Sequence, residues 1–120
     1  MTRLARVAPE LPAASLQSAI AFYERLGFET ASRLPGLGYA IVERDGIALH
    51  LFEDKVHRAT PIGVHIFTAD LTGLFEEFEG LGIRFAQKIE RKPWGNRDFR
   101  LRDDYGNELK FTEPHTAEDE

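Results

Sequence analysis

The stretch that decides the fold is residues 93–111, PWGNRDFRLRDDYGNELKF. Apolar and charged residues alternate on both sides of a central turn, with Phe99 and Leu101 before it and Leu109 and Phe111 after it. A period of two predicts two half-buried strands. The turn at residues 103–107 contains Gly and Asn, which tolerate positive φ, and Asp, which caps its own backbone. The stretch therefore predicts a loop followed by a β-hairpin.

The first half of the chain contains further strand and helix signals. Residues 4–11 predict a first strand, and Pro9 and Pro12 place it at a sheet edge or in an exchange between subunits, because proline lacks the ladder donor. Ser15 is expected to cap a helix that ends at Gly27. Three strands should follow at residues 28–34, 39–43 and 47–52, separated by turns at Pro35-Gly36 and Asp45-Gly46.

The second half repeats this order after a polar link at residues 53–60. Residues 62–68 predict a strand, Asp70 a helix cap, Gly82 the end of that helix, and residues 83–89 another strand. A shift of 55 carries Ser15 onto Asp70, and a shift of 60 carries Tyr39 and Leu49 onto Phe99 and Leu109. Each half is thus expected to be a βαβββ module.

The predicted fold class is α+β, with two βαβββ modules forming a curved mixed sheet with a cleft. The modules should span about residues 3–53 and 61–113 of a single domain of residues 1–120, with a flexible tail at 116–120. On strands, Ala48, His50 and Phe52 are expected to face the cleft, and Leu49 and Leu51 the helix.

Composition narrows the function. The chain has no cysteine, which excludes disulfides, thiol nucleophiles and cysteine-ligated zinc and suits a cytoplasmic location. A formal charge of −5 argues against nucleic-acid binding, because phosphate contacts need a basic face. No apolar run approaches the ~20 residues that span a bilayer.

The hairpin residues Asp103-Asp104-Tyr105-Gly106-Asn107, with Phe111, resemble the closing D-P-x-G-N-x-x-x-F signature of the vicinal oxygen chelate superfamily, which contains glyoxalases, bleomycin resistance proteins and dioxygenases. Asp104 stands where proline is usual. Pro93-Trp94-Gly95 is most similar to the bleomycin resistance proteins, and the resemblance extends to residues 8–12 and 22–28.

Metal-dependent members of that superfamily place His, Gln or Glu at one inward position on each of four strands. The matching positions here are Ala8, His50, Gly63 and Lys110, of which only His50 can donate to a metal. The inherited metal site is therefore expected to be absent, with no cofactor. A different site from Glu10, His50 and His65 stays open, and it would make the chain a metal-dependent lyase, isomerase or dioxygenase.

Binding rather than catalysis is the favoured interpretation. Trp94, Phe52 and Phe67 are candidates to line an aromatic ligand pocket, although core packing explains the two phenylalanines equally well. His50, His65 and Arg97 are further candidate ligand contacts. The resemblance implies a metal-free homodimer that exchanges its N-terminal strand through Pro9 and sequesters a bleomycin-type antibiotic. A regulatory or structural dimer without a dedicated ligand is a third possibility. Basic residues near the expected cleft would better suit an anionic or neutral ligand (Arg97, Arg100, Arg102 and Lys110).

Overall fold

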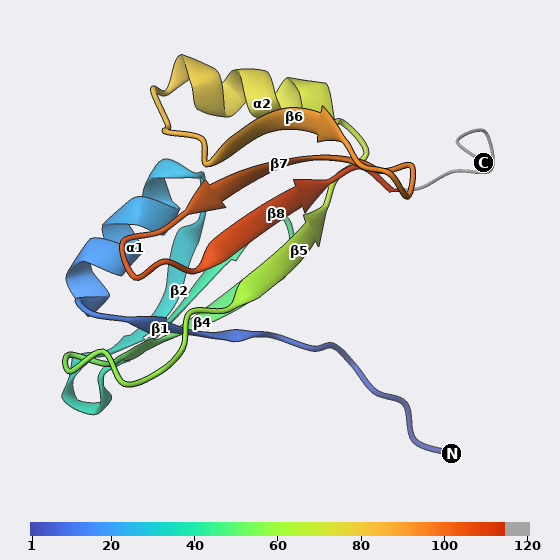
Figure 1. Ribbon diagram of the computed structural model, residues 1–120. Helices are drawn as coiled ribbons and strands as arrows, with labels where there is room; N and C mark the ends of the chain where they lie inside the picture. The colour runs from blue at the N-terminus through green and yellow to red at the C-terminus, as the bar shows by residue number, and fades with distance from the viewer. Residues whose placement is uncertain (115–120) are drawn as a thin grey trace. The chain divides into compact units, whose positions relative to one another are not determined.

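The computed structural model describes residues 1–114, so the tail predicted at residues 116–120 lies outside the described residues. The chain divides into two compact units, Met1–Thr60 and the part from Pro61 onward. The first contains β1 (Glu10–Ala13), α1 (Leu16–Arg25), β2 (Glu29–Leu34), the 3-10 helix η1 (Pro35–Leu37), β3 (Tyr39–Arg44) and β4 (Ile47–Glu53). The second contains β5 (Gly63–Phe67), α2 (Leu71–Gly80), β6 (Gln87–Arg91), β7 (Arg97–Arg102) and β8 (Glu108–Thr112) (Figure 1).

Each unit forms one four-stranded mixed sheet, and the two sheets have equivalent strand orders. The first sheet runs β1-β4-β3-β2 and the second β5-β8-β7-β6. The β1–β4 and β5–β8 pairs are parallel, and the other pairs are antiparallel. The α+β class and the repeated βαβββ module are thus confirmed, and the proline-flanked strand β1 lies at a sheet edge as expected.

Helix α1 begins and ends at the predicted residues. The Ser15 hydroxyl accepts a hydrogen bond from the Ser18 amide at 3.2 Å, which satisfies one of the free donors of the first turn. At the other end Gly27 has a φ of 90°, and Arg44 Nη1 donates to the Leu26 carbonyl at 2.7 Å. The buried positions recur every three or four residues and pack against the sheet (Leu16, Ala19, Ile20 and Tyr23).

Helix α2 is anchored on its sheet by aromatic side chains. Asp70 Oδ1 accepts from the Gly73 amide at 3.0 Å at the start of the helix. Phe78 is fully buried and makes edge-to-face contacts with Phe99 of β7 and Phe111 of β8, at centroid distances of 5.9 and 5.4 Å. Leu81 is half-exposed, because it is the C-cap residue beyond the last helical turn.

The closing hairpin is held by side-chain hydrogen bonds to its own backbone. Asp103 Oδ1 accepts from the amides of Tyr105, Gly106 and Asn107, at 3.0, 3.1 and 2.9 Å. Only Gly106 takes a positive φ, of 100°, so the tolerance expected of Asn107 is not used. Asn107 is instead fully buried. Its side-chain Nδ2 donates to Asp103 Oδ2, and its side-chain Oδ1 accepts from the backbone amide of Ile62 at 3.0 Å.

Two predicted strands begin too early in the sequence. The first starts at Glu10 rather than at residue 4, because the ladder with β4 begins where the His50 amide donates to the Pro9 carbonyl. The strand expected at residues 83–89 is β6, at Gln87–Arg91. The Ile83 amide donates back to Phe78 of α2, so pairing with β7 begins only at Ala86. Because the end of α2 uses the Ile83 amide, β6 begins later in the sequence than predicted.

The alignment of β3 with β7 is offset by one residue from the predicted shift. His50 stands opposite Ile41, whereas its counterpart Lys110 stands opposite Arg100. Tyr39 therefore corresponds to Asp98 and not to the buried Phe99. Because strand side chains alternate between faces, this single step places Tyr39 on the face that points away from α1.

Candidate functional site

A hydrogen-bonded chain of three side chains occupies the face of the first sheet opposite α1. Tyr39 Oη lies 2.9 Å from Glu10 Oε2 and 2.7 Å from His50 Nδ1. Glu10 and His50 are register partners across β1 and β4, and Tyr39 reaches them from β3. His50 was expected on this face, and Glu10 was named with it as a possible metal ligand. Tyr39 was missed, because the alternation within residues 39–43 fits either face and only the neighbouring strand selects one.

The number of protons on these three side chains fixes which of them donates each hydrogen bond. The phenol has one proton, and the Glu10 carboxylate has none, so Tyr39 donates to Glu10. His50 must then donate its Nδ1 proton to Tyr39, which leaves Nε2 of the neutral ring as an acceptor. Burial raises the pKa of the Tyr39 phenol above its ordinary value, and the hydrogen bond and the charge of Glu10 raise this pKa further. These three hydrogen-bonded side chains therefore present Nε2 of His50 as a hydrogen-bond acceptor.

Metal-ligand geometry is not found within residues 1–114, where no group of three or more His, Asp or Glu side chains is placed to hold an ion. Of the alternative set, Glu10 and His50 lie in the first unit and His65 in the second. The Glu10 carboxylate is bonded to Tyr39.

The second unit presents an imidazole and an aromatic ring on the equivalent face of its sheet. His65 and Phe67 of β5 stack at a centroid distance of 6.2 Å and an interplanar angle of 22°. His65 Nδ1 is 3.5 Å from the Thr112 hydroxyl. Phe67 is 58% exposed, so core packing does not explain it, whereas Phe52 of β4 is half-buried.

Trp94 lies exposed on a hydrogen-bonded loop between β6 and β7. Its exposed fraction is 63%. The Lys92 amide donates to the Asn96 carbonyl at 2.7 Å, and Arg91 Nη1 donates to the Gly95 carbonyl at 2.6 Å. Hydrogen bonds thus hold the loop that contains Trp94, and the exposed indole ring is accessible for stacking. The candidate Arg97 follows this loop, but its guanidinium makes two bonds to Glu113, at 2.9 and 2.8 Å.

A buried carboxylate on β7 was not anticipated. Asp98 is almost fully buried and accepts from Gln87 Nε2 at 2.6 Å, with Lys92 Nζ at 3.9 Å and Arg100 Nη2 at 3.3 Å. The sequence signal was its placement two residues before Arg100, on the same strand face. Two flanking cations and one amide compensate the burial of this charge.

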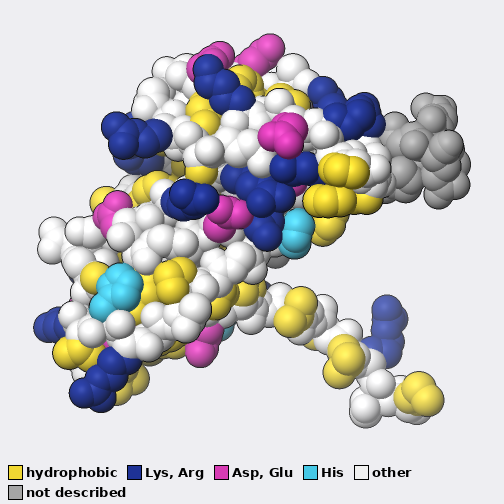
Figure 2. Space-filling view, in the orientation of Figure 1, with side chains coloured by type: hydrophobic (Ala, Val, Ile, Leu, Met, Phe, Trp, Pro, Cys, Tyr) yellow, Lys and Arg dark blue, Asp and Glu magenta, His cyan; other side chains and the backbone are white. Residues whose placement is uncertain are grey.

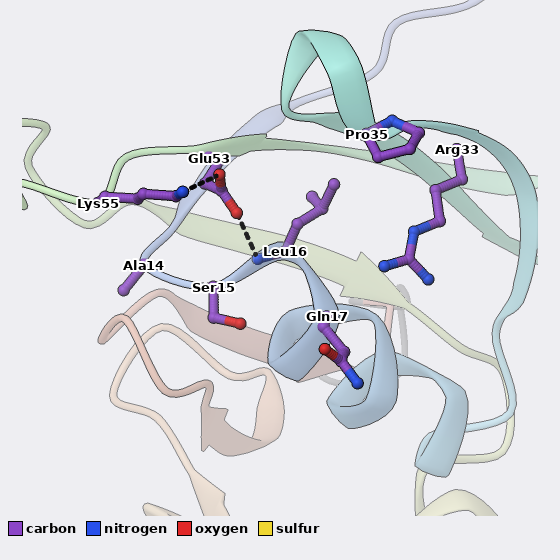
Figure 3. Close-up of a pocket in the computed structure, with 8 residues that line it drawn as sticks. All are labelled: Ala14, Ser15, Leu16, Gln17, Arg33, Pro35, Glu53 and Lys55. Atoms are coloured by element: carbon purple, nitrogen blue, oxygen red, sulfur yellow. Dashed lines mark hydrogen bonds and ion pairs between the residues drawn. The ribbon is translucent and has the colours of Figure 1, made fainter.

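A surface pocket of about 350 Å³ lies beside the start of α1 (Figure 3). The Glu53 carboxylate accepts from the Leu16 amide at 3.2 Å and lies 3.6 Å from Lys55 Nζ. The positive end of the helix is therefore already neutralised by an acid of the same unit, and we assign this pocket no ligand.

Comparison with known proteins agrees with this architecture. The crystal structure of a bleomycin-binding protein complexed with bleomycin is 26% identical to this chain, with a TM-score of 0.80 over 93% of this chain and 100% of the other. The bleomycin resistance determinant encoded on transposon Tn5 is 25% identical, with a TM-score of 0.80 over 94% and 100%. A lactoylglutathione lyase from Agrobacterium tumefaciens shares the fold at 24% identity and a TM-score of 0.75, over 94% and 96%.

The similar structures thus include a bleomycin-binding protein, a bleomycin resistance determinant and a lyase. No curated protein sequence matches the chain. None of the helices in the described part of the chain is long and apolar enough to cross a membrane. The family described as the glyoxalase/bleomycin resistance protein/dioxygenase superfamily matches residues 3–111. The chain therefore belongs to the glyoxalase/bleomycin resistance protein/dioxygenase superfamily.

Proposed function

We propose that the protein is a metal-free homodimer in the cytoplasm that binds and sequesters a bleomycin-type glycopeptide antibiotic, so conferring resistance without modifying the drug. The observation that carries this proposal is Trp94, an exposed indole on an ordered loop. Exposed tryptophans on ordered loops are suited to stacking on flat organic groups. The full-length similarity to a bleomycin-binding protein supports the same ligand class.

The proposed ligand contacts are aromatic and imidazole side chains of the two units. In the second unit they are Trp94, Phe67 and His65, with Arg97 next to the tryptophan loop. In the first unit they are Phe52 and His50. All six are at least partly accessible.

The proposed dimer rests on the N-terminal segment. Met1, Leu4 and Val7 are almost completely exposed, and the chain runs out from β1 without entering the sheet (Figure 1). A second copy of this chain is the partner we propose, with Pro9 as the hinge at which the arm exchanges. Sedimentation velocity tests this: the chain should sediment as a dimer, and removal of residues 2–7 should shift it toward monomer. A monomeric intact protein would contradict the dimer.

Titration with bleomycin tests the ligand. Trp94 is the sole tryptophan, so its fluorescence should be quenched on binding. Calorimetry of Trp94→Ala should then show affinity at least tenfold weaker, because stacking and burial of an indole contribute more than about 1.4 kcal/mol. Leu37→Ala removes another exposed apolar side chain and is the matched control. No quenching and no heat in the intact protein would reject the antibiotic as ligand.

A second candidate is an enzyme of the same superfamily, a metal-dependent lyase, isomerase or dioxygenase. The Glu10–Tyr39–His50 chain favours it, because an oriented imidazole can serve as a general base. Elemental analysis of the untreated protein separates the two candidates: stoichiometric metal would favour the enzyme.

A further inference from the structure

Four side chains form one row across the second sheet, on the face opposite α2. His65 pairs with Lys110, Lys110 with Arg100, and Arg100 with Gln87, each as register partners. Their strand neighbours are buried toward α2, including Ile66, Leu101 and Phe111. We call His65, Lys110, Arg100 and Gln87 the basic row. Figure 2 shows Lys and Arg side chains gathered over β7 and β8 with a histidine beside them.

The basic row is not a consequence of the fold. The equivalent row of the first sheet runs Glu10, His50, Ile41 and Ser32, by the same pairings. That row contains one acid and no permanently charged base. The second sheet has the same backbone arrangement with two cations side by side, so the sequence alone accounts for the positive charge.

Positive charge on this face exceeds the local negative charge. Arg100 bonds to Asp98 and Glu108 through its two Nη atoms, at 3.3 and 3.2 Å. Arg102 bonds to the same Glu108 at 3.1 Å, and Lys92 shares Asp98. Lys92 also pairs with Glu90 at 3.3 Å, so three carboxylates pair with three cations, before Lys110 is counted. Within residues 1–114, the Lys110 ammonium has no ion-pair partner, and the buried Nε of Arg100 has no acceptor.

An exposed aromatic ring lies on the same sheet face as the uncompensated ammonium. A Cβ added to Gly63 would lie 3.4 Å from Lys110 Nζ, so the amine lies directly above a residue without a side chain. On the other side, His65 stacks on the largely exposed Phe67. A cation without an ion-pair partner and an exposed aromatic ring therefore lie on the same face of the β5–β8 pair, on either side of His65.

We propose that the basic row binds the carboxylate of a flat aromatic ligand, with the carboxylate on Lys110 and the ring on Phe67. A carboxylate supplies the acceptor that the Lys110 ammonium lacks, and bonds of this kind are charge-assisted. An aromatic ring covers the exposed face of Phe67 in an offset stack. This inference goes beyond antibiotic sequestration, because it concerns an anionic ligand group. It shares Phe67 and His65 with the proposed antibiotic contacts but involves neither Trp94 nor the dimer.

The test compares 2-naphthoate with its neutral analogue 2-naphthamide. The backbone amide signals of β5 and β8 are followed by two-dimensional NMR while each compound is titrated at fixed ionic strength. Naphthoate should bind about tenfold more tightly than naphthamide, the difference expected when one charge-assisted bond is made. Lys110→Gln should remove this preference and leave naphthamide binding unchanged, and Phe67→Ala should weaken both compounds.

Lys88→Gln is the matched control, since it removes the same charge from an exposed position of β6. Its naphthoate affinity should stay within about twofold of that of the unaltered protein. Equal affinities for naphthoate and naphthamide in the unaltered protein overturn the proposal, whether or not Lys110→Gln folds. An equal loss in Lys88→Gln also overturns it, because the effect would then be long-range. Bleomycin binding followed through Trp94 is a separate measurement, so either proposal can fail alone.

Discussion

Glu10 and His50 are register partners across the parallel pair β1–β4, and the hydroxyl of Tyr39 joins their side chains. This relationship sets the direction of the hydrogen bonds. Because Tyr39 has one proton to give and Glu10 can only accept, His50 is left with Nδ1 as donor and Nε2 as acceptor. A histidine on a sheet surface is thereby held in one tautomer.

The tautomer of His50 is directly measurable. Long-range proton–nitrogen NMR spectra above neutral pH should show the neutral ring protonated at Nδ1. Tyr39→Phe removes the acceptor for that proton and should allow the ring to populate the Nε2–H form. His57, which is exposed, provides the internal comparison, since its tautomer should not respond to Tyr39→Phe. An Nε2–H ring in the unaltered protein would contradict the assigned hydrogen bonds.

The raised pKa of Tyr39 makes stability depend on pH in the alkaline range. The folded state holds the phenolic proton more tightly than the unfolded chain, so the contribution of Tyr39 is complete below its unfolded pKa of about 10. It is lost as the pH rises through the folded pKa. The unfolding free energy should therefore fall above pH 10, and Tyr39→Phe should remove part of that fall.

Glu10→Gln tests the cause of this shift. Burial would still raise the pKa of Tyr39, but the carboxylate charge would be gone. Tyr39 should then ionise at a lower pH than in the unaltered protein, as followed by absorbance of the phenolate after subtraction of the Tyr39→Phe titration. An unchanged Tyr39 titration would show that burial alone is responsible.

The buried carboxylate of Asp98 should matter more than its exposed counterpart at the same lysine. Lys92 lies 3.9 Å from Asp98 and 3.3 Å from Glu90, whose side chain is 57% exposed. Asp98→Ala leaves two cations without their buried acid and should cost about 3 kcal/mol in urea unfolding. Glu90→Ala should cost less than about 1 kcal/mol. Similar costs for both variants would mean that burial does not govern this network.

The closing hairpin should depend on Asn107 rather than on its exposed neighbour Asp104. Asn107→Ala removes the acceptor of the partly buried Ile62 amide and the buried donor to Asp103, and should destabilise the protein by about 2 kcal/mol. Asp104→Ala should change stability by less than about 0.5 kcal/mol, as is usual for exposed positions. Thermal or urea unfolding decides, and a small effect of Asn107→Ala would refute the buried role.

Much of the fold was predictable because its signals are local. The caps at Ser15 and Asp70, the glycine ends of both helices and the Asp103 turn depend on hydrogen bonds between residues a few positions apart. The repeated βαβββ order follows from these signals and from strand alternation. The prediction went wrong where a local signal competed with closure of α2, which moved the start of β6 to Gln87.

The sequence by itself determined the elements, their order, and the residues without metal-binding atoms at Ala8, Gly63 and Lys110. The tertiary structure decided the register between strands, because the partner strand and not the alternation selects which face a residue takes. That register placed Tyr39 between Glu10 and His50, and Lys110 beside Arg100. Both arrangements join residues far apart in the chain, so only long-range pairing could create them.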